Sequence, residues 1–357
     1  MRDAQAIRQA AEIIKRGGIV AFPTETVYGL GADAFNPLAV ARIFEVKRRP
    51  YFDPLIVHVA NDTDLSKLVI EIPPDAKRLI ERFWPGPLTV VLLKKDELPD
   101  IVTAGLPTVA IRMPKHPMTL SVIRLVGSPI VGPSANPFGY LSPTTAEHVR
   151  DQLGDRIDFI LDGGPCEVGV ESTIVSFFEK GPRLLRPGGV PLEEIESIIG
   201  KVEINSVNEE RPSAPGMLPR HYAPRTPIVL SWSEKDLVAF KDKDIGLLAF
   251  QESKHFLKFS CVEVLSKKGD FREAAANLFS AIRRLDALNL DLILAEPIPE
   301  VGLGRAIMDR LRRATAMISA DKKSISTFRG KGKGVYTTEA LMDDRKKERR
   351  MEDERKK

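Results

Sequence analysis

The stretch Gly17-Gly18-Ile19-Val20-Ala21-Phe22-Pro23-Thr24-Glu25-Thr26 decides the fold class of the first part of the chain. Before it, apolar residues recur at helical spacing, at Ile7, Ala10, Ala11 and Ile14. The glycine pair supplies a stop for that helix, and residues 19–22 form a short apolar run typical of a buried strand. A helix followed by a buried strand favours an α/β or α+β open sheet.

The rest of the first part repeats this alternation. Asn36-Pro37 is typical of an N-cap followed by proline at the first helical position, so we expect a helix from there through Arg48. Further strand-like runs lie at residues 55–59, 88–93, 108–112, 129–131, 159–161 and 172–178. Helical stretches lie near residues 75–83, 118–126 and 144–153. His58 is expected as the outward residue of its strand.

A proline-rich segment separates this part from a second one. Arg-Pro-Ser-Ala-Pro-Gly at 211–216 and His-Tyr-Ala-Pro at 221–224 indicate a semi-rigid linker. Strand-like runs resume at residues 228–232, 245–250, 262–265 and 292–295, with helices at 271–288 and 304–315. We therefore predict a first domain at 1–200, a linker at 201–226, a smaller α/β domain at 227–335 and a charged tail at 336–357.

Composition excludes several classes of protein. The 357 residues are 43% apolar and carry a net charge of +4 with both signs mixed, which is ordinary for a folded protein and too little to indicate nucleic-acid binding. Cys166 and Cys261 are the only cysteines, so a disulfide framework and a cysteine-rich zinc module are excluded. The N-terminus has no apolar signal core, and the longest apolar runs are of strand length. We expect a soluble protein of the cytoplasm.

Two glycine-rich stretches have the composition of anion-binding loops, but their neighbouring sequence does not single out an anion site. Residues 29–34 fit G-x-G-x-x-A, yet a dinucleotide fingerprint must lie directly between a strand and a helix, and a polar Pro-Thr-Glu-Thr segment precedes this one. No Walker A loop occurs. Gly302-Leu303-Gly304 stands at a predicted helix start, where close packing explains the glycines as well as an anion does.

Arginines at predicted strand ends give a stronger signal. Arg112 ends the 108–112 run, Arg186 ends another short apolar run, and Arg49 follows a helix. In an open α/β sheet, anionic ligands bind at the carboxyl ends of the strands. Small polar loops at 132–136 and 171–173 would add backbone N–H groups and hydroxyls, which suit oxyanions. Together these residues predict a site for phosphate and carboxylate groups.

Seven short motifs identify a family. They are Pro-Thr-Glu-Thr-Val-Tyr-Gly-Leu at 23–30, Lys-Arg-Arg-Pro at 47–50, Pro-Leu-Ile-Val-His-Val at 54–59, Trp-Pro-Gly-Pro-Leu-Thr at 84–89, Pro-Ser-Ala-Asn at 133–136, Val-Glu-Ser-Thr-Ile-Val at 170–175 and Leu-Arg-Pro-Gly-Gly at 185–189. With Pro-Gly-Met at 215–217 and His-Tyr-Ala-Pro at 221–224, the chain resembles the YrdC-like family in its longer, two-domain threonylcarbamoyl-AMP synthase form. The resemblance implies a twisted open-sheet catalytic domain followed by a smaller Rossmann-like α/β domain.

The resemblance also implies a reaction, in which L-threonine, bicarbonate and ATP give L-threonylcarbamoyl-AMP and pyrophosphate. It implies a threonine site formed by Thr26, His58, Arg112, Gly132 and Ser172. It implies an ATP site formed by Lys47, Arg49, Asp53, Thr108, Ser134, Asn136, Ser142, Arg186 and Tyr222. Asp53 stands where the family often has Asn, and an ionised carboxylate cannot donate a hydrogen bond to the nucleotide. Tyr222 would close over the bound nucleotide.

Cofactor and partners follow from the same resemblance. Mg²⁺ is expected to arrive with ATP, without a metal site of the protein's own. Neither cysteine lies in a matching motif, so no covalent nucleophile is expected. The product would serve the threonylcarbamoyladenosine modification of tRNA, so the downstream transferase machinery is an expected partner, and direct binding of tRNA is left open. No membrane partner is expected.

Two other functions compete with the synthase. An RNA-binding module without catalysis would use the same basic residues to follow a phosphate backbone, although aromatic residues are not interleaved with them. A hydrogenase-maturation carbamoyltransferase carries a related domain, but it would need cysteine-pair zinc motifs that two cysteines cannot supply.

Overall fold

The chain folds around two β-sheets. We describe it from a computed structural model, which defines residues 2–178, 181–204, 214–215, 217, 221–230, 240, 242–252 and 259–315. All of them belong to one compact unit, Met1–Met317. The predicted tail at 336–357 and much of the predicted linker lie outside the described residues, and the predicted domain boundaries stay predictions.

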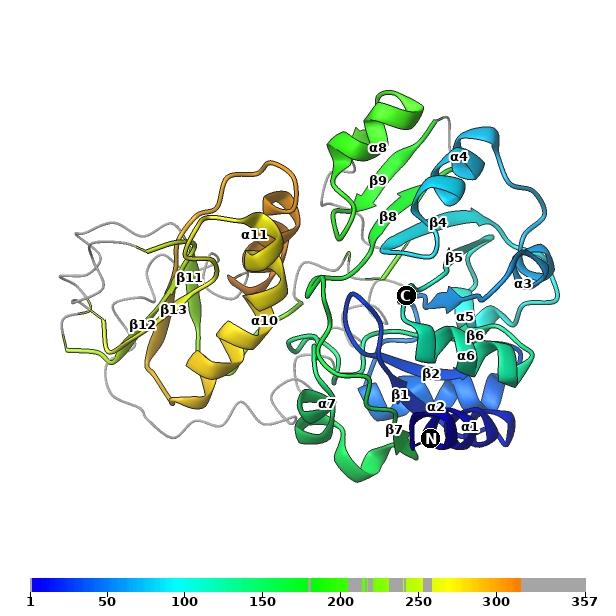
Figure 1. Cartoon of the computed structure of the whole chain (residues 1–357), viewed down its shortest axis with the longest axis horizontal. Coiled ribbons are helices and arrows are strands. Elements are labelled where there is room, and N and C mark those ends of the chain that lie inside the picture. Colours follow the sequence, from blue (N-terminus) through cyan, green and yellow to red (C-terminus); the bar gives the residue numbers. More distant parts are fainter. Residues whose placement is uncertain are drawn as a thin grey trace, which may run out of the picture. The chain divides into compact units, whose positions relative to one another are not determined.

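The first sheet has the strand order β10-β9-β8-β4-β5-β3-β6-β2-β1-β7. Its strands are β1 (Val20–Phe22), β2 (Gly29–Asp33), β3 (Ile56–His58), β4 (Leu88–Leu93), β5 (Thr108–Arg112), β6 (Ile130–Val131), β7 (Phe159–Ile160), β8 (Thr173–Ser176), β9 (Arg183–Arg186) and β10 (Glu203–Ile204). The helices around it are α1 (Arg2–Lys15), α2 (Pro37–Lys47), α3 (Asp62–Leu68), α4 (Pro74–Phe83), α5 (Asp100–Thr103), α6 (Pro117–Val126), α7 (Ala146–Gln152), α8 (Leu192–Ile199) and the 3-10 helix η1 (Gly154–Arg156). This large twisted sheet with surrounding helices confirms the predicted α/β open-sheet class (Figure 1).

Helices cover the two ends of this sheet differently. At the β1 end, α1 and α6 pack on the face that carries Val20 and Phe22, while α2 packs on the opposite face. At the β9 end, α4 and α8 pack on the face that carries Val90 and Val175. The other face of this end is built from Ile56, Val91, Ala110, Ile174 and Leu185. Among the described residues, Ala214 and Met217 complete that second cluster, so a loop takes the place of a helix there.

Strand register decides which polar side chains reach the face covered by this loop. β3 and β5 are parallel, with Ile56 opposite Ala110 and His58 opposite Arg112. Since side chains alternate along a strand, His58 and Arg112 point to the same face as Ile56 and Ala110. In the β8–β9 pair, Ile174 lies opposite Arg186, and a register shift follows at Val175. The irregularity turns Arg186 towards the same face, so the sheet brings His58, Arg112 and Arg186 together.

The second sheet is smaller and entirely parallel, with the order β11-β14-β12-β13. Its elements are β11 (Ile228–Leu230), β12 (Ile245–Ala249), β13 (Cys261–Val264), β14 (Leu292–Ala295), α10 (Phe271–Ala287) and α11 (Gly304–Thr315). The parallel strands, with β13 and β14 joined through α10, agree with the predicted Rossmann-like α/β part. In the described ranges, no helix is both long and apolar enough to cross a membrane.

The two parts share a hydrophobic cluster. Side chains of α10 and α11, such as Leu278 and Ile307, pack in it with Val27, Val170 and Tyr222 from the first part and the linker. The second sheet and its helices therefore rest directly on the loops that precede β2 and β8.

Local sequence signals explain several elements and miss others, among them α3, α5, α8, β10 and β2. Asn36 caps α2 as predicted, because its side chain accepts hydrogen bonds from the N–H groups of Leu38 and Ala39. β2 was absent from the predicted strands, since its two glycines have low strand propensity. The structure gives the reason for them: a Cβ at Gly29 or Gly31 would lie 2.6 or 2.8 Å from the Phe22 ring on β1.

The shared cluster gives a first prediction. Leu278→Ala should lower the free energy of unfolding by about 2–5 kcal/mol, because the side chain is fully buried and its loss leaves a cavity. The matched control is Leu288→Ala, since Leu288 is 53% exposed at the end of the same helix and should change stability by less than about 0.5 kcal/mol. Urea unfolding midpoints measure both, and equal midpoint shifts would contradict the packing described.

Candidate functional site

A cavity of about 40 Å³ lies on the face of the first sheet that the loop covers, where β3, β5 and β9 end. Its walls hold three arginines, Arg49, Arg112 and Arg186, and one carboxylate, Glu171. Three positive charges against one negative charge favour an anionic ligand. Backbone from the 132–134 loop and residues Pro215, His221 and Tyr222 of the linker region close the remaining sides.

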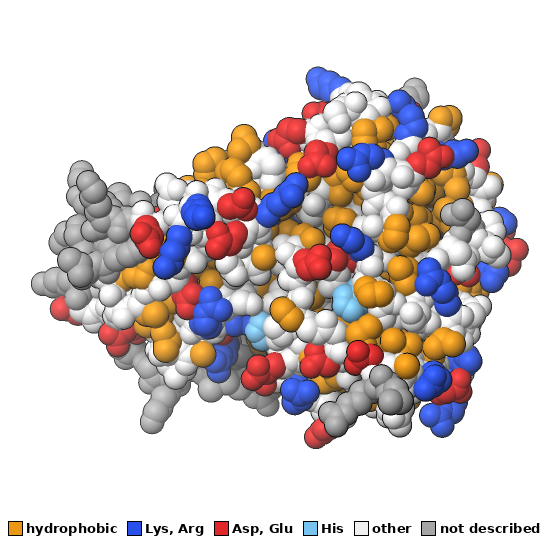
Figure 2. Space-filling view, in the orientation of Figure 1, with side chains coloured by type: hydrophobic (Ala, Val, Ile, Leu, Met, Phe, Trp, Pro, Cys, Tyr) orange, Lys and Arg blue, Asp and Glu red, His pale blue; other side chains and the backbone are white. Residues whose placement is uncertain are grey.

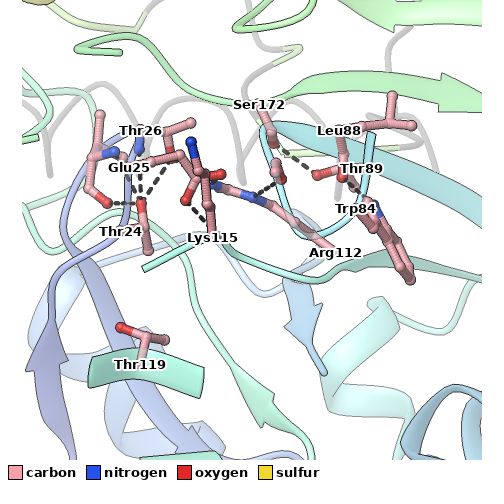
Figure 3. Close-up of polar contacts among 12 residues, drawn as sticks. Thr24, Glu25, Thr26, Trp84, Leu88, Thr89, Arg112, Lys115, Thr119 and Ser172 are labelled. Atoms are coloured by element: carbon pink, nitrogen blue, oxygen red, sulfur yellow. Dashed lines mark hydrogen bonds and ion pairs between the residues drawn. The ribbon is translucent and has the colours of Figure 1, made fainter. Parts of the chain in front are cut away.

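The guanidinium group of Arg112 is held by three neighbouring residues. It pairs with Glu25 (2.8 Å), donates to the Thr26 hydroxyl (2.8 Å) and donates through Nε to the carbonyl of Gly86 (3.1 Å). Figure 3 shows the side chain of Arg112 reaching from β5 towards the loop that carries Thr24, Glu25 and Thr26. Glu25 is held in turn by the backbone N–H of Lys115 (3.0 Å). A carboxylate therefore already occupies one side of the Arg112 fork.

His58 lies beside Arg112 and is buried. The sequence predicted an outward residue, but only 2% of the side chain is exposed, because the Phe22 ring (5.6 Å between centroids) and Gly132 cover it. A Cβ at Gly132 would lie 2.6 Å from the imidazole, so only glycine allows this approach. Burial and the charge of Arg112 hold the pKa of His58 well below its usual value, so the ring is neutral at pH 7.

Ser172 lines the same cavity as Arg112 and contacts Arg186. Its hydroxyl lies 2.7 Å from the hydroxyl of Thr89, a contact drawn in Figure 3. Arg186 donates to the Ser172 carbonyl (2.9 Å from Nη2) and to its hydroxyl (3.2 Å), and through Nη1 to the carbonyl of Pro215 (3.1 Å). Arg186 therefore fixes both the loop before β8 and the linker segment that lies over the sheet.

Lys47, Arg49 and Asp53 form a buried charged group after α2. Lys47 donates through Nζ to the carbonyls of Ser134 and Asn136, which anchors the polar loop between them. Arg49 pairs with Asp53 (2.9 Å) and lines the cavity, whereas Lys47 and Asp53 do not. Burial raises the pKa of Asp53 to about 6, although Arg49 and Lys47 oppose this. Burial also lowers the pKa of Lys47 well below its usual value.

Tyr222 and His221 cover the cavity from the linker region. Tyr222 has a positive φ of 65° and only 1% of its surface is exposed, with its ring 4.1 Å from the ring of His221 and 5.6 Å from that of Phe279. The backbone N–H of Ala223 donates to the carbonyl of Gly139 (2.9 Å). The segment therefore lies against the first part of the protein, and Tyr222 lines the cavity.

The predicted site residues fall into two groups. Those that line the cavity are Arg49, His58, Arg112, Gly132, Ser134, Ser172, Arg186 and Tyr222. Those that are buried but do not line it are Thr26, Lys47, Asp53, Thr108, Asn136 and Ser142. Thr108 lies at the start of β5, at the opposite end from Arg112. The Asn136 side chain donates to the carbonyls of Pro137 and Tyr140. Direct contacts of either group with a substrate stay predictions.

The charged residues Glu25, Glu171 and Arg310 lie at or beside the site and are absent from the predicted set. Glu25 and Glu171 lie in motifs quoted for their neighbours, so the sequence placed them near the site without giving them a part in it. Arg310 pairs with Glu171 (2.8 Å) from α11, 139 residues away in the chain. Neither spacing nor composition reveals such a contact.

Neither cysteine is among the described residues that line the cavity. Burial raises the pKa of the Cys166 thiol to about 12, so it is protonated at neutral pH and does not act as a thiolate. Across the described part of the chain, no group of three or more His, Cys, Asp or Glu side chains is placed to hold a metal ion.

Comparison with known proteins agrees with this geometry. The family model described as "Telomere recombination" matches residues 12–188, and the one described as "Threonylcarbamoyl-AMP synthase, C-terminal domain" matches residues 190–316. The chain is 46% identical over 318 residues to the threonylcarbamoyl-AMP synthase of Pyrococcus abyssi, covering 87% of this chain and 94% of that protein. It is 44% identical over 319 residues to the protein of the same name from Bacillus subtilis, covering 86% and 92%.

A solved structure extends the similarity to three dimensions. The crystal structure of Pyrococcus abyssi Sua5 complexed with L-threonine superposes with a TM-score of 0.81 at 46% identity, covering 87% of this chain and 94% of that one. Sequence identity, matching family models and fold agree along nearly the same residues. The chain belongs to the threonylcarbamoyl-AMP synthase family, whose members are nucleotidyltransferases.

Proposed function

We propose that this protein makes L-threonylcarbamoyl-AMP and pyrophosphate from L-threonine, bicarbonate and ATP. The observation that carries the proposal is the pair of buried arginines Arg112 and Arg186, which face one cavity on either side of Ser172. A substrate pair with a carboxylate and a polyphosphate needs two cationic sites at such close quarters. The threonine complex of the Pyrococcus abyssi relative supports the amino acid as one substrate.

The Arg112 end suits the amino acid. Its planar fork can hold a carboxylate through two parallel hydrogen bonds. In the structure one nitrogen of the fork forms an ion pair with Glu25, and the other donates to the Thr26 hydroxyl. The Thr26 and Ser172 hydroxyls and the neutral His58 ring lie around the fork and can bond the polar groups of threonine. A neutral imidazole beside Arg112 avoids a second positive charge next to the amine that must react.

The Arg49 and Arg186 end suits the nucleotide. Both guanidinium groups face the cavity, and the Ser134 loop is anchored by Lys47 from behind. Lys47 would thus act on the nucleotide site through that loop. A space of about 40 Å³ holds only a few water molecules, so His221 and Tyr222 must move apart from the sheet to admit ATP.

The chemistry needs positioning and charge stabilisation. Threonine and bicarbonate form a carbamate with loss of water, and a carbamate oxygen then attacks the α-phosphorus of ATP. The bond from the α-phosphorus to its bridging oxygen breaks, and pyrophosphate leaves with the electron pair. Arg49 and Arg186 would stabilise the charge on the phosphates, and Arg112 would hold the carbamate close to them. Mg²⁺ bound to ATP would neutralise phosphate charge; the arginine-lined cavity fits a metal held by the phosphates better than one held by the protein.

The product is a reactive mixed anhydride that a further protein would transfer to an adenosine of tRNA in the cytoplasm. RNA binding without catalysis is the rival function. On the face drawn in Figure 2, acidic and basic side chains alternate over the described residues, without a continuous basic track. That distribution favours a small-molecule enzyme over a nucleic-acid-binding surface.

The first test of this function is substrate dependence. Pyrophosphate release from ATP should require both L-threonine and bicarbonate. L-Serine should be used with about 10- to 200-fold lower kcat/KM, because a missing methyl group is worth only about 1–3 kcal/mol in a pocket. Release at equal rates with L-leucine, or without any amino acid, would rule out the proposed activity.

A second test concerns Arg112. Arg112→Ala should lower kcat/KM for threonine by about 30- to 1000-fold, or about 2–4 kcal/mol, because a buried charged contact is lost. Arg112→Lys should recover only part of this, since lysine lacks the planar fork. Arg78→Ala is the matched control, because Arg78 is an exposed arginine paired with Asp75 on α4. Threonine affinity of Arg112→Ala equal to that of the control would remove Arg112 from the threonine site.

A further inference from the structure

Arg310 is a buried arginine of α11 whose side chain lies close to the cavity. Only 1% of its surface is exposed, and it ranks among the largest fully buried side chains of the described residues. Its Nε donates to Oε2 of Glu171 (2.8 Å), and its Nη1 donates to the carbonyl of Pro187 (2.9 Å) and to Asp309 (2.6 Å). Arg310 does not itself line the cavity, so it cannot act on a substrate directly.

Glu171, the partner of Arg310, does line the cavity. Its other carboxylate oxygen accepts a hydrogen bond from the Ser142 hydroxyl (2.5 Å). Its carbonyl accepts from the N–H of Gly189 (2.9 Å), so the backbone is fixed as well. Among the described residues that form the walls, Glu171 carries the one carboxylate. A negative charge at this place opposes the binding of a polyphosphate unless a positive charge cancels it.

Arg310 also supports the residue that covers the cavity. Its guanidinium carbon lies 5.2 Å from the centre of the Tyr222 ring, a cation–π contact in a fully buried setting. Phe279 of α10 packs against the same ring. One side chain of the second part therefore touches both the acidic wall and the linker residue of the site.

We propose that Arg310 is a positioning residue of the nucleotide site, which holds Glu171 in place and cancels its charge so that the phosphates of ATP can bind. The proposal rests on the proposed function, because it assumes that ATP enters this cavity. Through this one guanidinium group, the second part of the protein would contribute to substrate binding.

The electrostatic surroundings of Glu171 are fully specified. Arg310 contacts it from α11, Arg186 acts on it from β9, His221 and Tyr222 from the linker region, and Ser142 donates to it from the loop before α7. Asp309 on α11 pairs with Arg310. Burial alone would raise the pKa of Glu171, but Arg310, Arg186 and the hydrogen bonds bring it down to about 2. Glu171 is therefore ionised at neutral pH, and loss of Arg310 would raise its pKa.

The experiment measures KM for ATP in the pyrophosphate-release assay, at saturating threonine and bicarbonate, with the full-length protein. Arg310→Met keeps the bulk and removes the charge, and it should raise KM for ATP by on the order of 10- to 100-fold with a smaller change in kcat. Arg310→Met combined with Glu171→Gln should recover KM to within about threefold of the wild type, because no uncompensated charge remains. Arg312→Met is the matched control, since Arg312 is an exposed arginine of α11 paired with Glu300.

The pH dependence of KM for ATP shows whether Arg310 cancels the charge of Glu171 or has a merely structural role. The ratio of KM for Arg310→Met to KM for the wild type should fall as the pH is lowered from 8 to 6, because Glu171 then becomes partly protonated in the variant and stays ionised in the wild type. The double variant should show the same ratio at both pH values. A lower melting temperature with unchanged KM, or a ratio independent of pH without recovery in the double variant, would overturn the proposal.

Two further outcomes keep the test decisive. If Arg310→Met alone does not fold, Glu171→Gln is compared with the double variant, and removal of Arg310 from that background should change KM for ATP by less than about threefold. A larger change would contradict charge cancellation. If the wild type releases no pyrophosphate with threonine and bicarbonate, the proposed function itself fails, which is a different result from an active wild type with an unaffected Arg310→Met variant.

Discussion

The guanidinium of Arg112 lies at the end of β5 with only 4% of its surface exposed, and it is fixed by Glu25, Thr26 and the carbonyl of Gly86. A cation removed from water requires such partners, since an unpaired buried charge is strongly destabilising. The same requirement applies to Arg186, which is held by Ser172 and the linker carbonyl of Pro215. The loops of the site are thus ordered around buried arginines, and the cavity is the space that these groups share.

This constraint also explains how the two parts of the protein depend on each other. One face of the first sheet carries the buried arginines of the cavity, and residues of the linker region cover this face. Arg310 of α11 pairs with Glu171, the carboxylate of the cavity wall. Tyr222 lies in the cluster shared with α10 and α11 while it lines the cavity. Movement of this residue to admit a nucleotide must therefore disturb apolar contacts with the second part, which links substrate entry to the packing between the two parts.

Sequence patterns predicted the elements whose signals are local. The Asn36 cap, the strand ending in Arg112 and the helices of the second part follow from spacing and capping residues, and the structure has them. β2 could not be predicted because its glycines are selected by the Phe22 ring of another strand. The burial of His58 depends on Gly132, and the pairing of Glu171 depends on Arg310, so both arise only when distant segments meet. Residue types near the site were predictable, whereas their partners were not.

The central claim is that two substrates with negative charge share one arginine-lined cavity, and a crystal structure with L-threonine and a non-hydrolysable ATP analogue tests it most directly. The account predicts the threonine carboxylate within hydrogen-bond distance of Arg112 and the phosphates beside Arg49 and Arg186. It also predicts Tyr222 over the nucleotide and the Glu171–Arg310 pair intact. Threonine bound away from Arg112, or a nucleotide bound outside this cavity, would contradict the account.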